Sequence, residues 1–196
     1  YYGSLGLQSQ EGIIKENKLN RYTGRINVNQ KFLDDRLDLD FNLNATYTYN
    51  YRPPIGTMIG SAISANPTFP AYDSKGAPYQ YLSGVNPLIT LNLEKDVTSI
   101  NRLIGSISPS FRITKNLKYK LNFGIDNSTS ARDIQSRSNA VPLQDGRLET
   151  INLYNQNKLI ENYFTYTLSK TNYNLSAVLG HSYQKIFIQG RTSSIN

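Results

Sequence analysis

Residues 37–51 read LDLDFNLNATYTYNY, and this stretch decides the fold class. Every odd position is aliphatic or aromatic and every even position is polar, without exception. The first set is Leu37, Leu39, Phe41, Leu43, Ala45, Tyr47, Tyr49 and Tyr51. Because successive side chains of a β-strand point to opposite faces, the segment predicts one strand with an apolar face and a polar face.

This strand is too long for an ordinary soluble sheet. Soluble strands usually have about five or six residues, whereas about 9 to 11 tilted residues already cross a membrane. At about 3.3 Å per residue and a tilt near 45°, the segment rises on the order of 35 Å. Its end should therefore stand above the hydrocarbon, with Tyr47, Tyr49 and Tyr51 in an aromatic girdle.

The same alternation recurs in residues 22–32, 117–128 and 173–185, the last with Val178 as an exception. Weaker strands are expected at 1–8, 101–113 and about 150–168. The sequence therefore predicts an all-β fold, a transmembrane antiparallel β-barrel segment of about seven strands. Residues 1–196 would form part of one outer-membrane barrel domain.

The expected connections fall into two classes. Residues 33–36, 114–116 and 169–172 are tight polar turns, whereas 9–20, 52–100 and about 129–149 are long. Outer-membrane barrels have short periplasmic turns and longer extracellular loops, so the tight turns should face the periplasm. Residues 52–100 would be a long extracellular loop, and within it residues 57–65 fit either a helical turn or a strand.

Composition agrees with a barrel wall. Apolar residues make up 38% of the chain and the mean hydropathy is -0.48, as expected where every second strand residue faces a polar lumen. No run of 18 apolar residues is present, so no transmembrane helix is expected. Residues 1–6 do not resemble a signal peptide, and the chain is expected to begin within a longer protein.

Chemistry is sparsely represented in the sequence. Cysteine is absent and His181 is the one histidine, which excludes disulfides, a thiolate nucleophile and a His-rich zinc site. Asp34 with Asp35, and Asp38 with Asp40, are interpreted as solvated charge in a turn and on the polar face. The net charge of +7 is scattered and forms no basic run, which argues against nucleic-acid binding. We therefore predict that the protein is not an enzyme and that the chain has no catalytic, cofactor-binding or metal-binding residues.

Three stretches carry a family resemblance. They are YYGSLGL followed by QEGIIKENKLNRYTGRINV, the segment SAISANPTFPAYDSKGAPY followed by NPLITLN, and ENYFTYTLSKTNYNLSAVLGHSYQK. Together they resemble the barrel of SusC/RagA-type TonB-dependent outer-membrane transporters, whose barrels have roughly twenty-two strands. The resemblance covers nearly the whole chain but a middle part of the barrel only. The plug domain and the TonB-interaction segment of the family have no counterpart here.

The resemblance implies import of oligosaccharides or peptides through the bacterial outer membrane, with a SusD-like surface lipoprotein as lid and energy from the TonB complex. Contact with the lipid bilayer and lipopolysaccharide is expected, and no cofactor. A passive porin and a soluble β-rich carbohydrate-binding module remain alternatives. Candidate residues for substrate or lid contact are aromatic and lie in the long loop, although they are equally able to pack it: Phe69, Tyr72, Tyr79 and Tyr81.

Overall fold

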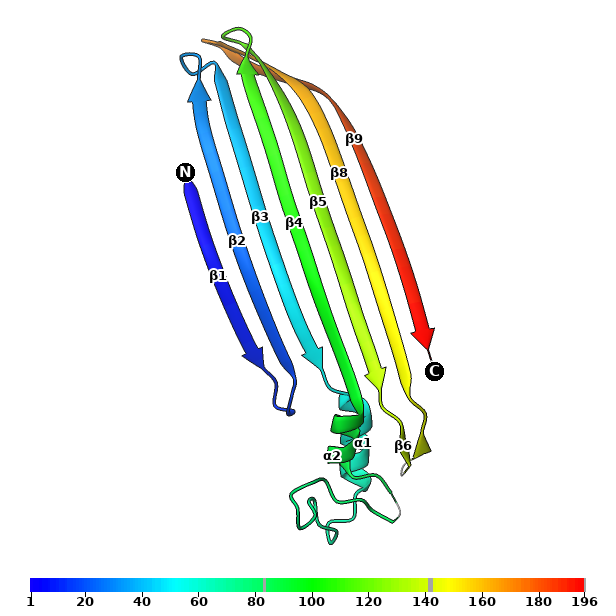
Figure 1. The fold of residues 1–196 in the computed structure, drawn as a ribbon. Coiled ribbons are helices and arrows are strands. Elements are labelled where there is room, and N and C mark those ends of the chain that lie inside the picture. The colour runs from blue at the N-terminus through cyan, green and yellow to red at the C-terminus, as the bar shows by residue number, and fades with distance from the viewer. Residues whose placement is uncertain (83, 141–142, 196) are drawn as a thin grey trace.

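The computed structural model describes residues 1–82, 84–140 and 143–195. Seven strands form one antiparallel sheet in the order β1-β2-β3-β4-β5-β8-β9 (Figure 1). The strands are β1 (Tyr2–Glu11), β2 (Lys18–Phe32), β3 (Leu37–Arg52), β4 (Glu94–Arg112), β5 (Leu117–Ser136), β8 (Arg147–Lys170) and β9 (Tyr173–Ile195). The predicted all-β class and the expected number of strands are confirmed.

The register places the apolar sets of neighbouring strands on one face. Leu43 pairs with Ile26 on one side and with Gly105 on the other, and Gly105 pairs with Ile125. Residues in register share a face, so the apolar positions of β2 to β5 form one continuous surface. We call the face that carries Leu43 the outward face, and the opposite one the lumen face.

Tight turns join the strands at one end of the sheet. Leu33, Asp34 and Asp35 all have positive φ, and the Arg36 amide donates to the Leu33 carbonyl at 3.1 Å. The β4–β5 connection has four residues and the β8–β9 connection has two, and both lie at the same end (Figure 1). The three predicted tight turns are therefore present.

Two of the predicted long connections are shorter than expected. Half of residues 9–20 belong to strands, because β1 extends to Glu11 and β2 begins at Lys18, with an ion pair of 3.1 Å between these two side chains. Cross-strand pairing holds these polar residues in place although they show no alternation. In the same way β5 and β8 pair up to Ser136 and Arg147, beyond the expected limits of the 129–149 connection.

The long connection between β3 and β4 spans residues 53–93, because β4 begins at Glu94 rather than near Ile100. It contains helices α1 (Ile55–Ser64) and α2 (Pro87–Leu93), which contact each other. Residues 57–65 are therefore largely helical, and α2 was not expected from the sequence. Two further short strands, β6 (Asn139–Ala140) and β7 (Leu143–Gln144), pair between β5 and β8. In the described part of the chain, no helix is long and apolar enough to cross a membrane.

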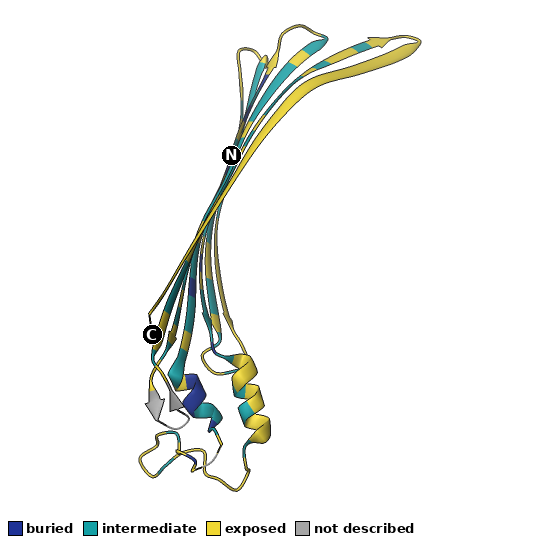
Figure 2. Ribbon diagram, turned by 90° about the vertical axis from the view of Figure 1, so that its right-hand side faces the viewer, coloured by how far each residue is buried: buried dark blue, intermediate teal, exposed yellow. Residues whose placement is uncertain are grey.

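The pattern of burial in the sheet is the reverse of that in a soluble β-sandwich: large apolar side chains are exposed and small polar ones are buried. Seen edge-on, the strands form a single twisted layer, with the helices beyond one end (Figure 2). Large outward residues on central strands, such as Ile107 and Phe123, are exposed, while Ser108 and Ser110 are buried on the lumen face. The buried hydrophobic residues of the described chain all lie in the long connection: Tyr81, Ile89 and Leu91. The apolar face of the sheet therefore has no protein core to meet.

The strands are staggered from β3 to β9. Leu37, the first residue of β3, shares a register row with Phe111, Tyr119, Phe164 and Leu179. Leu179 is already six residues into β9, which begins at Tyr173. Such a stagger accompanies the strand tilt of a barrel. Depth along the barrel is therefore better counted from the turn end of each strand than along a row.

Candidate functional site

Charged side chains pair across the lumen face of β4 and β5. Arg102 forms a two-point interaction with Asp126, with Nε to Oδ1 at 2.9 Å and Nη2 to Oδ2 at 2.7 Å. Both side chains are partly exposed, at 52% and 34%. A two-point geometry fixes the direction of the guanidinium, and partial exposure leaves it accessible to water. The pair is thus suited to a hydrated lining.

A second charged group lies nearer the helix end of the same face. Asp96 accepts hydrogen bonds from Arg132 Nε and Nη2, at 2.9 and 2.6 Å. Arg52 lies 3.6 Å from the same carboxylate and donates to Thr98 Oγ1 at 2.6 Å. Three strands are linked in this way. The carboxylate is shared by two cations, so the group as a whole carries a net positive charge.

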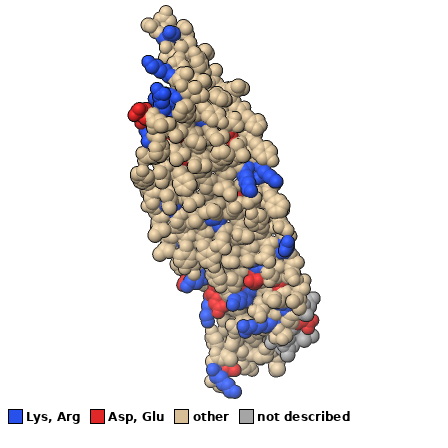
Figure 3. Space-filling view, turned by 45° about the horizontal axis from the view of Figure 1, so that its top comes forward, with Lys and Arg blue, Asp and Glu red and all other residues tan. Residues whose placement is uncertain are grey.

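Further polar side chains, both neutral and charged, continue this network toward the turn end. Ser108 Oγ donates to Asn122 Oδ1 at 2.7 Å, and Asn122 Nδ2 donates to Glu161 Oε2 at 3.0 Å. Lys118 lies 3.7 Å from Asp38. In the view of Figure 3, lysine, arginine and carboxylate groups gather mainly toward the two ends, with further cations along one side, and uncharged side chains cover most of the middle. The lumen face therefore offers both signs of charge together with amides and hydroxyls.

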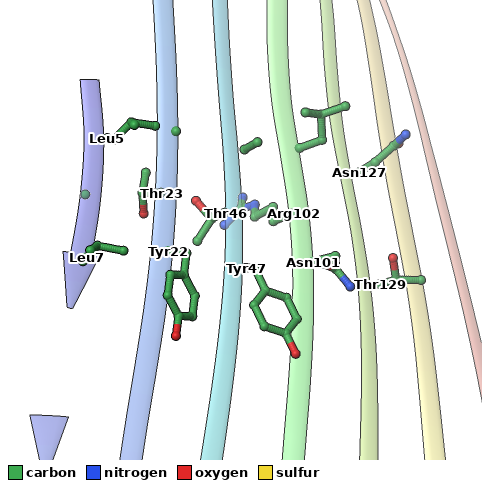
Figure 4. Close-up of a pocket in the computed structure, with 14 residues that line it drawn as sticks. Leu5, Leu7, Tyr22, Thr23, Thr46, Tyr47, Asn101, Arg102, Asn127 and Thr129 are labelled. Carbon is green, nitrogen blue, oxygen red and sulfur yellow. The ribbon is translucent and has the colours of Figure 1, made fainter. Parts of the chain in front are cut away.

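The outward face carries the predicted aromatic girdle on β2 and β3. The rings of Tyr22 and Tyr47 stack with centroids 6.2 Å apart, and both point toward the helix end of the sheet (Figure 4). Beside them lies a hollow of about 590 Å³ over Gly24 and Ala45, walled by Leu5 among others. Tyrosine is favoured where an apolar ring meets lipid and its hydroxyl meets water. The tyrosines mark one border of the apolar band.

One asparagine organises the long connection. The Asn86 side chain is 1% exposed, and its Nδ2 donates to the carbonyls of Ala71 and Tyr79, both at 2.9 Å. Its Oδ1 accepts from the Leu88 amide at 3.0 Å and caps α2. Because the side chain satisfies three backbone groups, it ties three parts of the connection together. The connection is therefore folded, and nothing in the composition indicated this asparagine.

The structure brings three of the four candidate aromatic residues together. Phe69 and Tyr81 have ring centroids 5.1 Å apart, and Tyr79 lies 6.0 Å from Tyr81. Tyr81 is buried at 6% exposure, so its ring packs the connection. Phe69 and Tyr79 are partly exposed, and Tyr72 is the most exposed at 51%, with no ring contact among the described residues. The ring faces open to a ligand are therefore those of Phe69, Tyr72 and Tyr79.

The residues considered for chemistry are dispersed. His181 lies on the outward face opposite Asn162, whereas Asp38 and Asp40 lie on the lumen face beside Lys118 and Asn29 respectively. Among the described residues, no group of three or more His, Cys, Asp or Glu side chains is arranged to hold a metal ion. The Asp–Arg pairs were missed by the sequence analysis, because spacing along one strand does not give the register between strands.

Comparison with known proteins places these surfaces in a family. No family model matches the chain. A TonB-dependent receptor of Formosa agariphila is 30% identical over 200 residues, covering 95% of this chain and 20% of the relative. The TonB-dependent receptor SusC of Bacteroides thetaiotaomicron is 27% identical over 139 residues, covering 57% of this chain and 14% of SusC. The chain thus spans a fifth or less of the curated relatives it matches.

Solved structures share the fold. The RagAB peptide importer in its open-open state matches with a TM-score of 0.77 at 19% identity, covering 98% of this chain and 23% of that one. The closed-closed state gives a TM-score of 0.75 with the same identity and coverage. The curated relatives are receptors and not enzymes. The chain is similar to SusC in sequence and to RagAB in fold, and it belongs to the TonB-dependent receptors, a family of integral outer-membrane β-barrel proteins.

Proposed function

We propose that the protein containing this chain imports large nutrients across the outer membrane. The chain would supply part of the wall, part of the lumen lining and an outer loop. One observation carries the proposal: over the middle of strands up to 24 residues long, charged pairs such as Arg102 and Asp126 lie on one face, while the other face is mostly apolar. A hydrated lining and a lipid-facing surface are what an import barrel requires.

The proposed substrates are oligosaccharides or peptides. A lining with both signs of charge, amides and hydroxyls hydrogen-bonds either class without selecting one net charge. The structural neighbours, which share the fold at 19–20% identity, are named as a peptide importer and a peptide transporter. Their names favour peptides as the substrate class. Residues 53–93 would face the outside, where exposed Phe69, Tyr72 and Tyr79 can stack on a sugar ring or contact a lid.

Two partners are proposed. One is a SusD-like surface lipoprotein that covers the lumen, and the other is the TonB complex. Coupling to TonB would pass through parts of the protein outside this chain. The long, folded connection supports a lid partner, because its internal hydrogen bonds through Asn86 hold a defined surface at the sheet end away from the tight turns.

Uptake in the presence and absence of TonB tests the proposal. Cells that carry the full-length protein should take up labelled oligosaccharides or peptides, and deletion of TonB should abolish that uptake. A passive porin with the same barrel wall would retain uptake when TonB is deleted. Replacing Phe69, Tyr72 and Tyr79 by alanine should lower uptake or lid association while the barrel still assembles. Unchanged uptake in both experiments would contradict the proposal.

A further inference from the structure

We propose that the outward face of β8 and β9 binds the phosphorylated head group of a glycolipid of the outer leaflet, the class that includes lipopolysaccharide. The site is centred on Lys158, Lys185 and Arg191, which we call the outward basic cluster. The inference rests on the orientation proposed above, in which the tight turns face the periplasm. It is independent of what the barrel transports.

The three cations share the lipid-facing side of the sheet. Lys158 pairs in register with Lys185 on β9 and with Ile125 on β5. Ile125 continues the row through Gly105 to Leu43, which defines the outward face. Arg191 is six residues beyond Lys185, and residues an even number apart on a strand point the same way. All three side chains are exposed.

Their depth matches the border between hydrocarbon and head groups. Lys185 lies twelve residues from Tyr173, the first residue of β9, and Lys158 lies twelve residues from Lys170, the last residue of β8. Tyr49 of the girdle is likewise twelve residues from the start of β3. About 9 to 11 tilted residues cross the hydrocarbon, so both ammonium groups stand just beyond it.

Among the described residues, the two lysines of the cluster have no counter-charge. Lys158 and Lys185 are directly opposite each other, a placement that destabilises a sheet when both charges are alike. Neither forms an ion pair within the described chain. Among described residues on the outward side of β5, β8 and β9, the one carboxylate is Asp133, which accepts a hydrogen bond from Thr150. A phosphate between the two lysines would offset their repulsion.

A polar hollow of about 200 Å³ lies farther from the turn end on the same side. Its lining includes Asn152, Tyr154, Gln189 and Arg191. Amides, a phenol hydroxyl and a guanidinium are donors and acceptors suited to sugar hydroxyls and a further phosphate. The order from the turn end is therefore a mostly apolar band that includes the Asn162–His181 pair, two ammonium groups and then a hydrogen-bonding hollow. The acyl chains, phosphates and sugars of a phosphorylated glycolipid follow the same order.

Pairing of a further strand with β9 would leave this surface in place. Strands add in the plane of the sheet through backbone hydrogen bonds, and the side chains of β9 keep their faces. The cluster would then be flanked by more of the barrel wall. Charge complementarity at the head-group level makes an anionic lipid the occupant, because the outer leaflet is the surface that meets these residues.

Lipid binding by the full-length barrel tests the proposal. The purified protein in detergent is titrated with phosphorylated rough lipopolysaccharide, and binding is read by native mass spectrometry. Each cation near an anionic surface contributes about fivefold, so a variant carrying Lys158→Gln, Lys185→Gln and Arg191→Gln should bind on the order of a hundredfold more weakly. The single variant Lys185→Gln should lose about fivefold. Lys120→Gln, which removes the same charge from the lumen face, should bind as the wild type does.

Two further arms identify the source of the phosphate. Dephosphorylated lipopolysaccharide should bind the wild type as weakly as the phosphorylated lipid binds the triple variant. Inorganic pyrophosphate should not displace the lipid at equal concentration. Equal binding by wild type and both cluster variants would overturn the proposal, as would full displacement by pyrophosphate. Nutrient uptake measured on the same variants separates this result from the importer proposal, because loss of lipid binding with intact uptake leaves that proposal standing.

Discussion

Tyr163 lies directly opposite Gly180 in the β8–β9 ladder. A Cβ placed on Gly180 would lie 2.8 Å from the Tyr163 Cβ and 3.1 Å from the Asn162 carbonyl oxygen. The two residues pair in register on the lumen face. An aromatic residue opposite a strand glycine shields the backbone that the glycine leaves bare. The close approach requires glycine at this position.

Substitution at this glycine should weaken the β8–β9 pairing. Gly180→Ala forces two backbones apart and should cost about 1–3 kcal/mol, as overpacking does. Gly190→Ala is the matched control, because its nearest contact is the Leu153 Cδ1 at 3.9 Å. Urea unfolding of the full-length barrel in lipid vesicles measures both. Equal stability of the two variants would contradict the close approach.

The Arg102–Asp126 pair should contribute little to stability. Both groups are partly exposed to the lumen, where water screens their attraction, so a double-mutant cycle should give a coupling energy of about 1 kcal/mol or less. Alanine at each position and at both supplies the cycle, with unfolding followed at low and high salt. A coupling several times larger that salt does not reduce would mean that this face is dry.

Loss of the Asn86 side chain should loosen the long connection and spare the barrel. Asn86→Ala removes the side-chain hydrogen bonds to the Ala71 and Tyr79 carbonyls and to the Leu88 amide, while the Ala71 carbonyl keeps the bond from the Tyr79 amide at 3.0 Å. Each buried group left unsatisfied costs on the order of 1–3 kcal/mol. Amide hydrogen exchange across residues 53–93 should accelerate while that of β3 and β4 does not. Asn66→Ala is the control, because Asn66 caps only its local turn through Thr68. Unchanged amide exchange in the Asn86 variant would show that contacts other than those of Asn86 hold the connection together.

The sequence predicted strands well where one face meets lipid. The segment predicted at 37–51 corresponds to Leu37–Arg52, and those predicted to begin at 117 and 173 start there. Beyond the apolar band both faces meet water or loops, so alternation fades. The start of β4 at Glu94 and the pairing of Gln10 with Leu19 were missed for this reason. Pairing with a neighbouring strand, which no single segment encodes, extends the sheet there.

The candidate site was predictable in kind but not in detail. The alternation of residues 117–128 puts Lys118 in the polar phase of its strand, and the structure has it on the lumen face beside Asp38. The partners of such charged residues depend on register, because Arg102 reaches diagonally to Asp126 rather than to Ser128, its partner in the row. The buried position of Tyr81 depends on how residues 53–93 fold back on themselves through Asn86. Helix α2 is seven residues long, too short for a periodic pattern to show.

The central claim is that the face carrying Leu43 meets lipid and the face carrying Asn42 meets water. Leu43 is six residues from the turn end of β3, near the middle of the hydrocarbon, so Leu43→Arg should cost about 2–4 kcal/mol and Asn42→Arg little.

The most direct measurement uses spin labels at positions 41, 42, 43 and 44 of the full-length barrel in lipid vesicles. Labels at 41 and 43 should respond to a relaxation reagent dissolved in the bilayer, and labels at 42 and 44 to one dissolved in water. If both faces respond to the water-soluble reagent, or if labels at 41 and 43 are shielded from both reagents as in a protein core, the transmembrane assignment is contradicted.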